Sequence, residues 1–459
     1  MSTKFDAIVI GTGQSGPSLA QRFAKEGLRV AVIERKLFGG TCVNTGCIPT
    51  KTLVASAYVA HMARRAREYG VDVGGPLKVD MERVKARKDE IVAASRNGVM
   101  GWMERLEGAT VYRGHVRFTG PNTVSVNGEV LEAAKIIINT GGRALIPAMP
   151  GIDRVPYFTN SSMMEVDFLP DHLLIVGGSY IGLEFAQAYR RFGARVTVVE
   201  MAERLIARED QDVSDAVREI LEAEGIDVRL NAKCLAVERE GEGIVMQLDC
   251  SAGAPRVQGS HLLLAVGRRP NTDDLGLDRA GLNTDAKGFI IVDDQCRTNV
   301  PGIWAIGDVN GRGAFTHTSY NDFEIVAANL FDGDPRRISD RIPCYALFID
   351  PPLGRVGMAE HEVRPKGIKA LAAKRMMTSV GRARERGETL GFMKVVVDAE
   401  TKKLLGAAIL GLGGDEVVHT CLDVMAAGAP YTAISRTVHI HPTVAEYLPT
   451  LLGDLKPLV

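Results

Sequence analysis

Two cysteines five positions apart have the residue type and spacing for redox chemistry. Cys42 and Cys47 lie in the run GGTCVNTGCIPTKT, which spans residues 39–52. Beside a cofactor that carries two electrons, such a pair can pass reducing equivalents from a nucleotide to an external acceptor. The spacing also suits a metal site, but the run contains no further Cys or His to complete tetrahedral ligation. The pattern favours a redox pair.

The run leads into a segment with helical periodicity, residues 52–68. The positive end of a helix dipole at this point would lower the pKa of the thiols and make them better nucleophiles. The remaining five cysteines are isolated in the sequence, and we expect them to be buried or incidental thiols. They are Cys234, Cys250, Cys296, Cys344 and Cys421.

An internal repeat predicts two nucleotide-binding units. Residues 5–34 and 171–200 each read as a strand, a glycine turn, a helix and a second strand that ends in an acid. Because the acid keeps the same register to its turn in both copies, the match is stronger than a single glycine motif. The residues are Gly11, Gly13, Gly16 and Glu34 in the first copy, and Gly177, Gly178, Gly182 and Glu200 in the second.

Each position in these turns has a physical reason. The first glycine makes a tight turn, the next lets backbone N–H groups approach a pyrophosphate, and the last allows close packing of helix on strand. The acid accepts hydrogen bonds from ribose hydroxyls. The second copy has Ser179 where the middle glycine belongs, and a serine is still small enough for a dinucleotide to approach.

Length and composition bound the remaining possibilities. A chain of 459 residues suggests about three domains, and a net charge of -1 gives no support to nucleic acid as a partner. The longest apolar stretches, such as His172–Val176 and Leu262–Val266, fall far short of the ~20 residues of a membrane span. The start MSTKFDAIVI has no signal-peptide features. We therefore expect a cytoplasmic protein without membrane contact, in which a working disulfide is transient and catalytic.

Further motifs carry a resemblance to a known family. IWAIGDV contains Gly307 and Asp308, and HIHPTVAE spans residues 439–446. With the two glycine units and the cysteine run, they make the chain resemble the flavin-dependent pyridine nucleotide–disulfide oxidoreductases over essentially its whole length. CVNTGCIPTKTLV, FTHTSYNDFEIV (315–326) and DPPLGRVGM (350–358) are most similar to the mercuric-reductase-like branch, and within it to copper(II) reductases of reactive-chlorine resistance.

The resemblance implies an α/β fold. It has two Rossmann-like dinucleotide-binding domains, one for FAD and one for NAD, and a C-terminal α+β dimerisation domain. The implied boundaries are 1–150 and 271–340 for the two parts of the FAD domain, 151–270 for the NAD(P)H domain and 341–459 for the interface domain.

The resemblance also implies how the cofactors bind. NADH is expected rather than NADPH because Glu200 favours a free ribose 2′-hydroxyl, although Arg204 or Arg208 would offer a phosphate contact. The implied FAD residues are Gly11, Gly13, Gly16, Glu34, Lys51, Thr140, Gly141 and Asp308. The implied NAD residues are Gly177, Gly178, Gly182, Glu200 and Gly267.

By the same resemblance, Cys47 is the flavin-side thiolate and Cys42 exchanges with the acceptor. Lys51 and Glu184 match the family's ion pair beneath the flavin. His441 is the general acid–base, oriented by Glu446, and in the family it reaches the cysteines of the other subunit. An obligate homodimer follows.

Three residues near these motifs have no settled role. His439 fits either a packed position or the edge of the pocket. His317 and Tyr320 stand where this branch differs from the lipoamide enzymes, so they are candidates for acceptor selection.

The acceptor is left open between several kinds of molecule. Soft thiolates favour Cu or Hg over hard cations, and a disulfide is the other option. The chain has no vicinal cysteine pair in its ending GDLKPLV and no preceding metal-binding CxxC, which counts against efficient Hg(II) reduction. Dihydrolipoyl dehydrogenase is the main alternative, and Glu200 disfavours glutathione reductase. A flavoprotein redox sensor is the alternative of another class, although a sensor would not need the His441–Glu446 pair.

Overall fold

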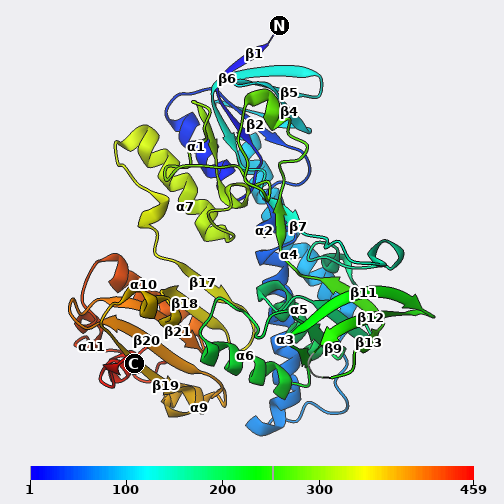
Figure 1. The fold of residues 1–459 in the computed structure, drawn as a ribbon, viewed down its shortest axis with the longest axis vertical. Coiled ribbons are helices and arrows are strands. Elements are labelled where there is room, and N and C mark those ends of the chain that lie inside the picture. The colour runs from blue at the N-terminus through cyan, green and yellow to red at the C-terminus, as the bar shows by residue number, and fades with distance from the viewer. Residues whose placement is uncertain (1, 251–252, 459) are drawn as a thin grey trace.

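The structure is a computed structural model that describes residues 2–250 and 253–458 (Figure 1). It contains both copies of the predicted strand–turn–helix–strand unit. In the first copy β1 (Thr3–Ile10) and β2 (Val30–Glu34) flank α1 (Gly16–Lys25). In the second copy β8 (His172–Val176) and β9 (Arg195–Val199) flank α5 (Tyr180–Phe192).

The N-terminal unit is built on a seven-stranded sheet at the top of Figure 1, with the order β3-β2-β1-β6-β5-β4 and β16 beside β6. Strands β1, β2, β3, β6 and β16 run parallel. Most apolar residues of β1, β2 and β6 are buried because helices cover such sheets, and those of the outer strand β3 are half-buried. The remaining strands are β3 (Ala109–Arg113), β4 (Val116–Gly120), β5 (Thr123–Val126), β6 (Glu129–Ile138) and β16 (Ile303–Ala305).

The middle unit has a parallel sheet of order β10-β9-β8-β14 and an antiparallel layer of order β11-β12-β13. The two-stranded ribbon of β7 (Gly142–Ala144) and β15 (Arg268–Pro270) connects it to the N-terminal unit. The other elements are α6 (Gln211–Ala223), β10 (Asp227–Arg229), β11 (Ala232–Glu240), β12 (Gly243–Cys250), β13 (Arg256–Gly259) and β14 (His261–Leu264).

The C-terminal unit is an antiparallel sheet of order β17-β18-β21-β20-β19-β22. Its strands are β17 (Cys344–Leu347), β18 (Leu353–Gly357), β19 (Ala370–Met376), β20 (Phe392–Asp398), β21 (Leu404–Leu410) and β22 (Lys456–Pro457). Its helices are α8 (Glu360–Val363), α9 (Gly381–Glu385), α10 (Gly414–Ala426), α11 (Thr432–Ser435) and α12 (Tyr447–Leu452).

Two helices carry the cysteine run down from the N-terminal sheet. These are α2 (Gly40–Asn44) and α3 (Cys47–Arg65); α3 continues beside α4 (Met81–Glu104) and reaches α5 of the middle unit (Figure 1). Helix α3 therefore begins five residues before the segment whose periodicity predicted it. Likewise the sequence predicts a helix from about Ser319 to Phe331, whereas α7 (Thr316–Ala327) begins three residues earlier and is followed by a short π-helix, Ala328–Asp332.

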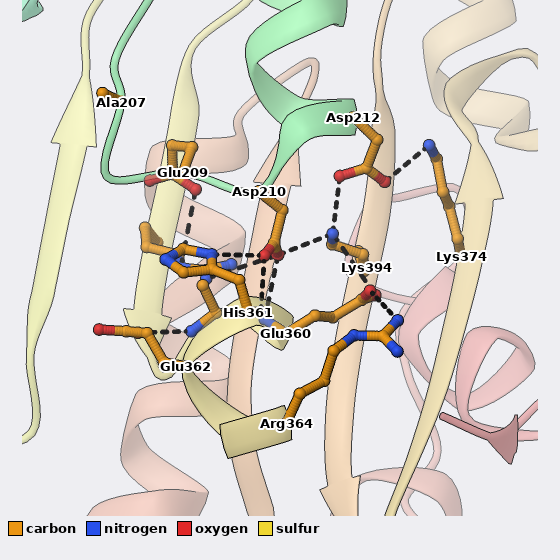
Figure 2. A network of polar contacts seen from close by, with 12 residues as sticks. Ala207, Glu209, Asp210, Asp212, Glu360, His361, Glu362, Arg364, Lys374 and Lys394 are labelled. Atoms are coloured by element: carbon orange, nitrogen blue, oxygen red, sulfur yellow. Dashed lines mark hydrogen bonds and ion pairs between the residues drawn. The ribbon is translucent and has the colours of Figure 1, made fainter. Parts of the chain in front are cut away.

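A buried polar network joins the start of α6 to the C-terminal sheet (Figure 2). Asp210 accepts hydrogen bonds from Lys394 Nζ at 2.8 Å and from the backbone N–H of His361 at 3.1 Å. Lys394 is 3% exposed and also contacts Asp212 at 2.7 Å and Glu360 at 3.4 Å. Because each of these buried charges is paired, the network holds the middle and C-terminal units together without leaving an uncompensated ion.

Residues 2–250 and 253–458 show neither a membrane-spanning helix nor a metal-binding cluster. Within these residues no helix is both long enough and apolar enough to cross a bilayer. The same residues contain no group of three or more His, Cys, Asp and Glu side chains arranged to hold a metal ion.

Candidate active site

A cavity of about 1070 Å³ runs from the first glycine turn to the cysteine run, and side chains of all three units line it. Of the predicted residues, it is lined by Gly11, Gly13, Glu34, Cys42, Cys47, Lys51, Thr140, Gly141, Glu184 and Asp308. Its lining does not include Gly16, Gly177, Gly178, Gly182, Glu200, Gly267, His441 or Glu446.

The first turn owes its shape to close backbone packing. Gly11 has φ +102°, and a Cβ atom there would lie 2.3 Å from the carbonyl oxygen of Asn139. A Cβ at Gly16 would lie 2.2 Å from the carbonyl oxygen of Gly11, so Gly16 packs helix on strand and does not face the cavity. A Cβ atom at Gly13 would make only an ordinary van der Waals contact with its surroundings. The backbone of Gly13 lines the cavity, where it is open to a ligand.

The second turn repeats this geometry. Gly177 has φ +116° and a Cβ there would meet the carbonyl oxygen of Ala265 at 2.4 Å; at Gly182 it would meet that of Gly177 at 2.1 Å. Ser179 occupies the place of Gly13 with φ -108°, a backbone conformation that any residue adopts. The serine is therefore compatible with the turn, as its size suggested.

The two strand-end acids are fixed in the same way. Glu34 accepts hydrogen bonds from the backbone N–H of Thr12 at 3.0 Å and of Lys36 at 2.8 Å. Glu200 accepts from the N–H of Gly178 at 2.6 Å and of Ala202 at 2.8 Å. Each carboxylate is thus held against its glycine turn, where a ribose would lie beside a bound pyrophosphate.

Four further cofactor candidates lie around the β7–β15 ribbon. Thr140 Oγ1 donates to the carbonyl of Asn271 at 2.9 Å, and Gly141 follows in a left-handed conformation. Asp308 faces the cavity and pairs with Arg268 at 3.3 Å. Gly267 has φ +127° and lies at the end of β14, next to this ribbon.

The two cysteines are free thiols in the structure and hydrogen bond to each other. Cys47 is the first residue of α3, and its Sγ lies 3.0 Å from Thr316 Oγ1. The hydrogen bond from Cys42, helped by that from Thr316 and the positive charge of Lys51, lowers the pKa of Cys47 to about 6 although burial opposes the shift. The same hydrogen bond, together with burial, raises the pKa of Cys42.

The asymmetry assigns different states to the two sulfurs. At neutral pH Cys47 is the thiolate of the reduced pair and Cys42 is the protonated partner that stabilises it. Cys47, the favoured thiolate, is thus the first residue of α3. Its pKa is lowered by side-chain hydrogen bonds and the charge of Lys51, which the sequence alone did not supply. The contribution of the helix N-terminus stays a prediction.

Lys51 and Glu184 form the predicted ion pair. Lys51 Nζ lies 2.8 Å from Glu184 Oε2 and 3.0 Å from Oε1, and Glu184 is 5% exposed. Lys51 stands four residues after Cys47 on α3, so both side chains lie on one face of the helix. The pair places a positive charge at the cavity wall near the thiolate.

His441 and Glu446 also pair as predicted, with Nδ1 of His441 3.0 Å from Glu446 Oε2. The His441 side chain is 79% exposed and lies outside the cavity of its own subunit. His439 is half-buried, and its Nδ1 contacts the carbonyl of Thr437 at 2.9 Å. Within one subunit the pair does not line the cavity that contains the cysteines.

The two residues predicted as candidates for acceptor selection, His317 and Tyr320, differ in whether they line the cavity. His317 lines the cavity, with Nε2 2.7 Å from the carbonyl of Cys344 and its ring stacked on Phe315. Tyr320 does not line it; its ring packs on Phe323 and is 40% exposed.

Four of the five other cysteines lack the low pKa of Cys47. Cys296 and Cys421 are buried, and burial raises the pKa of each thiol, as it does for Cys234 and Cys344. Raised pKa values make these thiols poor nucleophiles at neutral pH. Cys344 nevertheless lines the same cavity as Cys47, which its isolated place in the sequence did not indicate.

Sequence reasoning missed three residues that shape the site. Thr316 contacts Cys47, and Phe348 lies against Lys51 with its ring centroid 4.3 Å from Nζ. Asn139 donates from Nδ2 to the carbonyls of Gly11 and Gly13, at 3.3 Å each. Thr316 falls in the quoted FTHTSY stretch, but nothing in the sequence linked it to a cysteine 269 positions away.

Family models cover both parts of the chain. Residues 5–322 match the model described as pyridine nucleotide-disulphide oxidoreductase. Residues 344–452 match that of the pyridine nucleotide-disulphide oxidoreductase dimerisation domain. The chain belongs to this family. The expected fold class is thereby confirmed: two Rossmann-like dinucleotide-binding domains and a C-terminal dimerisation domain, which supports a homodimer.

Relatives in this family have several names. The chain is 34% identical to "Probable pyridine nucleotide-disulfide oxidoreductase RclA" of Escherichia coli, over 99% of this chain and all of that protein. A mercuric reductase of Streptomyces lividans is 35% identical, over 97% of this chain and 95% of that protein. A dihydrolipoyl dehydrogenase of Thermus scotoductus is 34% identical, over 97% of this chain and 96% of that protein. A solved structure described as a Cu(II) complex of the RclA flavoprotein disulfide reductase superposes with a TM-score of 0.90 at 33% identity, covering 98% of this chain and 99% of that one.

Members of this family depend on FAD and use a pyridine nucleotide, and the cavity fits FAD. It begins at a glycine turn whose open backbone suits a pyrophosphate and ends at the thiolate and the lysine. On its wall, the buried Oδ1 of Asn44 has no hydrogen-bond partner among the described residues, as expected where a ligand completes the site.

Proposed function

We propose that the protein is an NADH-preferring, FAD-dependent reductase that passes electrons through Cys42 and Cys47 to a soft metal ion or a disulfide. The observation that carries the proposal is the position of the pair. Cys47 begins α3 as the favoured thiolate, hydrogen bonded to Cys42, in the cavity that starts at the FAD-type glycine turn.

Different groups of residues would have different roles around bound FAD. When bound, FAD accepts two electrons from NADH and makes them available to the cysteine pair. Gly11, Gly13 and Glu34 would hold its pyrophosphate and ribose, with Thr140, Gly141 and Asp308 along the rest of the cavity. Lys51, fixed by Glu184, supplies positive charge beside Cys47.

Electrons and protons balance at the sulfurs. Reducing the Cys42–Cys47 disulfide takes two electrons and gives two thiols after two protons are added. When the disulfide re-forms, the two electrons reduce two Cu(II) ions to Cu(I), with release of two protons, or cleave one external disulfide, which takes up both protons. Cys42 is the sulfur proposed to meet the acceptor, because Cys47 contacts Thr316 and is the sulfur whose pKa the charge of Lys51 lowers.

His441 is proposed as the general acid–base that serves this exchange across a homodimer. Glu446 holds the Nδ1 side of the ring, so the other ring nitrogen is free to move a proton. The exposure of His441 outside its own cavity fits a role in the site of a second copy.

The preference for NADH rests on the second turn. The carboxylate of Glu200 sits against the turn through Gly178, where it would accept from a free 2′-hydroxyl and repel a 2′-phosphate. Arg204 donates to Gln211 and to the carbonyl of Ala207, each at 3.2 Å, so its guanidinium is engaged within its own loop. Comparing kcat/KM for NADH and NADPH tests the assignment, and a Glu200→Gln variant should narrow the difference.

An acceptor panel tests the proposed function. Steady-state NADH oxidation would be measured with Cu(II), Hg(II), a small disulfide and lipoamide, each against a Cys42→Ala control that excludes direct reaction of NADH with the acceptor. We expect turnover with Cu(II) that exceeds turnover with Hg(II) and lipoamide. The solved Cu(II) complex of the RclA relative supports that order.

The other outcomes are equally informative. Fast turnover with lipoamide would overturn the metal-ion assignment in favour of a dihydrolipoyl dehydrogenase, a name that a 34% identical relative carries. Oxidation of NADH with none of the acceptors would overturn the enzyme assignment and favour a redox sensor. A cytoplasmic location, expected from the sequence, is part of the same proposal because the dithiol must persist between turnovers.

A further inference from the structure

The Lys51 ammonium lies where the three units meet. Lys51 belongs to α3 of the N-terminal unit, and its ion-pair partner Glu184 belongs to α5 of the middle unit. Phe348 follows β17 in the C-terminal unit, and its ring centroid lies 4.3 Å from Lys51 Nζ. The ammonium is therefore held between a carboxylate and the face of an aromatic ring.

Phe348 contacts both members of the ion pair. Besides the contact of its ring with Lys51, its backbone N–H donates to Glu184 Oε1 at 3.1 Å. The ring lines the cavity, so it also covers the ammonium on that side. A face-on ring attracts a cation and restricts where it can move, and the attraction is stronger when the pair is partly removed from water.

The segment that carries Phe348 is itself fixed on α5. The backbone N–H of Asp350 donates to Gln187 Oε1 at 2.7 Å, and Gln187 Nε2 donates to the carbonyl of Asp350 at 2.8 Å. The Asp350 carboxylate pairs with Arg191 at 2.6 Å. Glu184, Gln187 and Arg191 follow each other at helical spacing, so one face of α5 holds the whole segment.

We propose that Phe348 is a positioning residue that sets the place of the Lys51 charge relative to Cys47. Its ring and its backbone N–H fix the lysine and the glutamate together, which ties the docking of the C-terminal unit to the reactivity of the thiolate. The inference deepens the proposed function, on which it rests, by adding a residue that acts through Lys51 without touching the sulfur.

The test measures the thiolate of Cys47 directly. A Cys42→Ser background leaves one sulfur of the pair, and alkylation by iodoacetamide is followed at Cys47 by peptide mass mapping from pH 4.5 to 8.5. Thr316 Oγ1, the hydroxyl at position 42 and the Lys51 ammonium are the groups that act on this sulfur in that background. The alkylation midpoint reports the pKa of Cys47 without an acceptor or turnover.

Phe348→Leu is expected to raise the midpoint by about 0.5 pH unit, which would halve the alkylation rate near the original midpoint. Phe348→Tyr keeps the ring and should restore the original profile. Phe331→Leu is the matched control: its ring lies 5.1 Å from the guanidinium carbon of Arg22, so it removes a ring beside a cation elsewhere in the fold. This control should leave the profile unchanged.

The remaining outcomes test the role of Phe348 and the role of the Lys51 charge separately. If Phe348→Leu binds FAD and melts like its parent but keeps the parent midpoint, the inference is overturned; a midpoint that moves equally in Phe348→Tyr overturns it too. Lys51→Met in the same background separates this from the proposed function. If Lys51→Met leaves the midpoint unmoved, the role proposed for the Lys51 charge fails as well; if it raises the midpoint and Phe348→Leu does not, only the role of Phe348 fails.

Discussion

Lys394 and Lys51 both meet carboxylates where two units of the molecule join, but their surroundings differ. Lys394 is 3% exposed and lies within reach of Asp210, Asp212 and Glu360 (Figure 2). The Lys51 side chain is 35% exposed, has the single carboxylate of Glu184, and faces a cavity. The charge of the buried Lys394 is fully compensated by its carboxylates, so it does not act on a ligand. The charge of Lys51 is only partly compensated and can act on groups in the cavity.

The difference separates a structural ion cluster from a functional one. Burial by itself raises the pKa of Asp210, but the hydrogen bonds from Lys394 and His361 hold it well below its usual range. The charges of that network compensate one another and join α6 to the C-terminal sheet. At Lys51 the charge acts instead on a neighbouring thiol, whose pKa it helps to lower. Substitutions in the two places should therefore change different measurements.

The largest expected effect is on turnover and belongs to the cavity. Cys42→Ala should lower acceptor-dependent NADH oxidation about 1000-fold or more, because no disulfide can form with Cys47. FAD should remain bound and the melting temperature should change little, as measured by flavin absorbance and calorimetry. Retained turnover would mean that electrons leave the flavin directly and that the pair is not on the path.

The next effect is on stability and belongs to the network. Lys394→Met should reduce the free energy of unfolding by about 3–5 kcal/mol, because it leaves the buried carboxylate of Asp210 without its lysine partner. Denaturant unfolding measures the loss, and turnover per folded, FAD-loaded molecule should stay close to that of the parent. A large fall in turnover at unchanged stability would show that the network takes part in the chemistry and would break the comparison.

Lys51→Met should reduce turnover strongly and stability only slightly, the opposite of what is expected for Lys394→Met. We expect turnover to fall about 10- to 100-fold, since the charge beside the thiolate is lost. The cost in stability should be smaller than for Lys394→Met, because the lysine is partly exposed and has one carboxylate partner. Measuring turnover and unfolding on the same preparations of both variants gives the contrast directly; equal losses of stability would contradict it.

The two regions should also respond to acid in different ranges. Reduced Cys47, with a pKa of about 6, should be alkylated faster as the pH rises from 5 to 7 and then level off. Asp210 and Asp212 have lowered pKa values in the fold, so their stabilisation is complete above their unfolded pKa and is lost as the pH falls below about 4. Unfolding measured from pH 3 to 7, with Lys394→Met as control, should show this acid loss in the parent and much less of it in the variant.

Short-range patterns predicted the nucleotide turns well. Gly11, Gly16, Gly177 and Gly182 were identified from spacing alone, and each fills a place where a Cβ atom would collide with a backbone carbonyl. Such constraints act within one strand–turn–helix unit, so they leave a trace in consecutive residues. The boundaries of α3 and α7 were less accurate, because the first turns of those helices are fixed by the cavity they enter and not by periodicity.

By itself the sequence determined the order of the units, the two strand-end acids and the cysteine pair, since each is written in residue type and local spacing. The Lys51–Glu184 and His441–Glu446 pairs were implied by the resemblance to the family. Only the tertiary structure decided that Thr316 contacts Cys47, that Phe348 covers Lys51, that Cys344 shares the cavity, and that Lys394 closes a buried network. These contacts join segments more than a hundred residues apart. No local pattern encodes them, because they depend on how three separately folded units pack against one another.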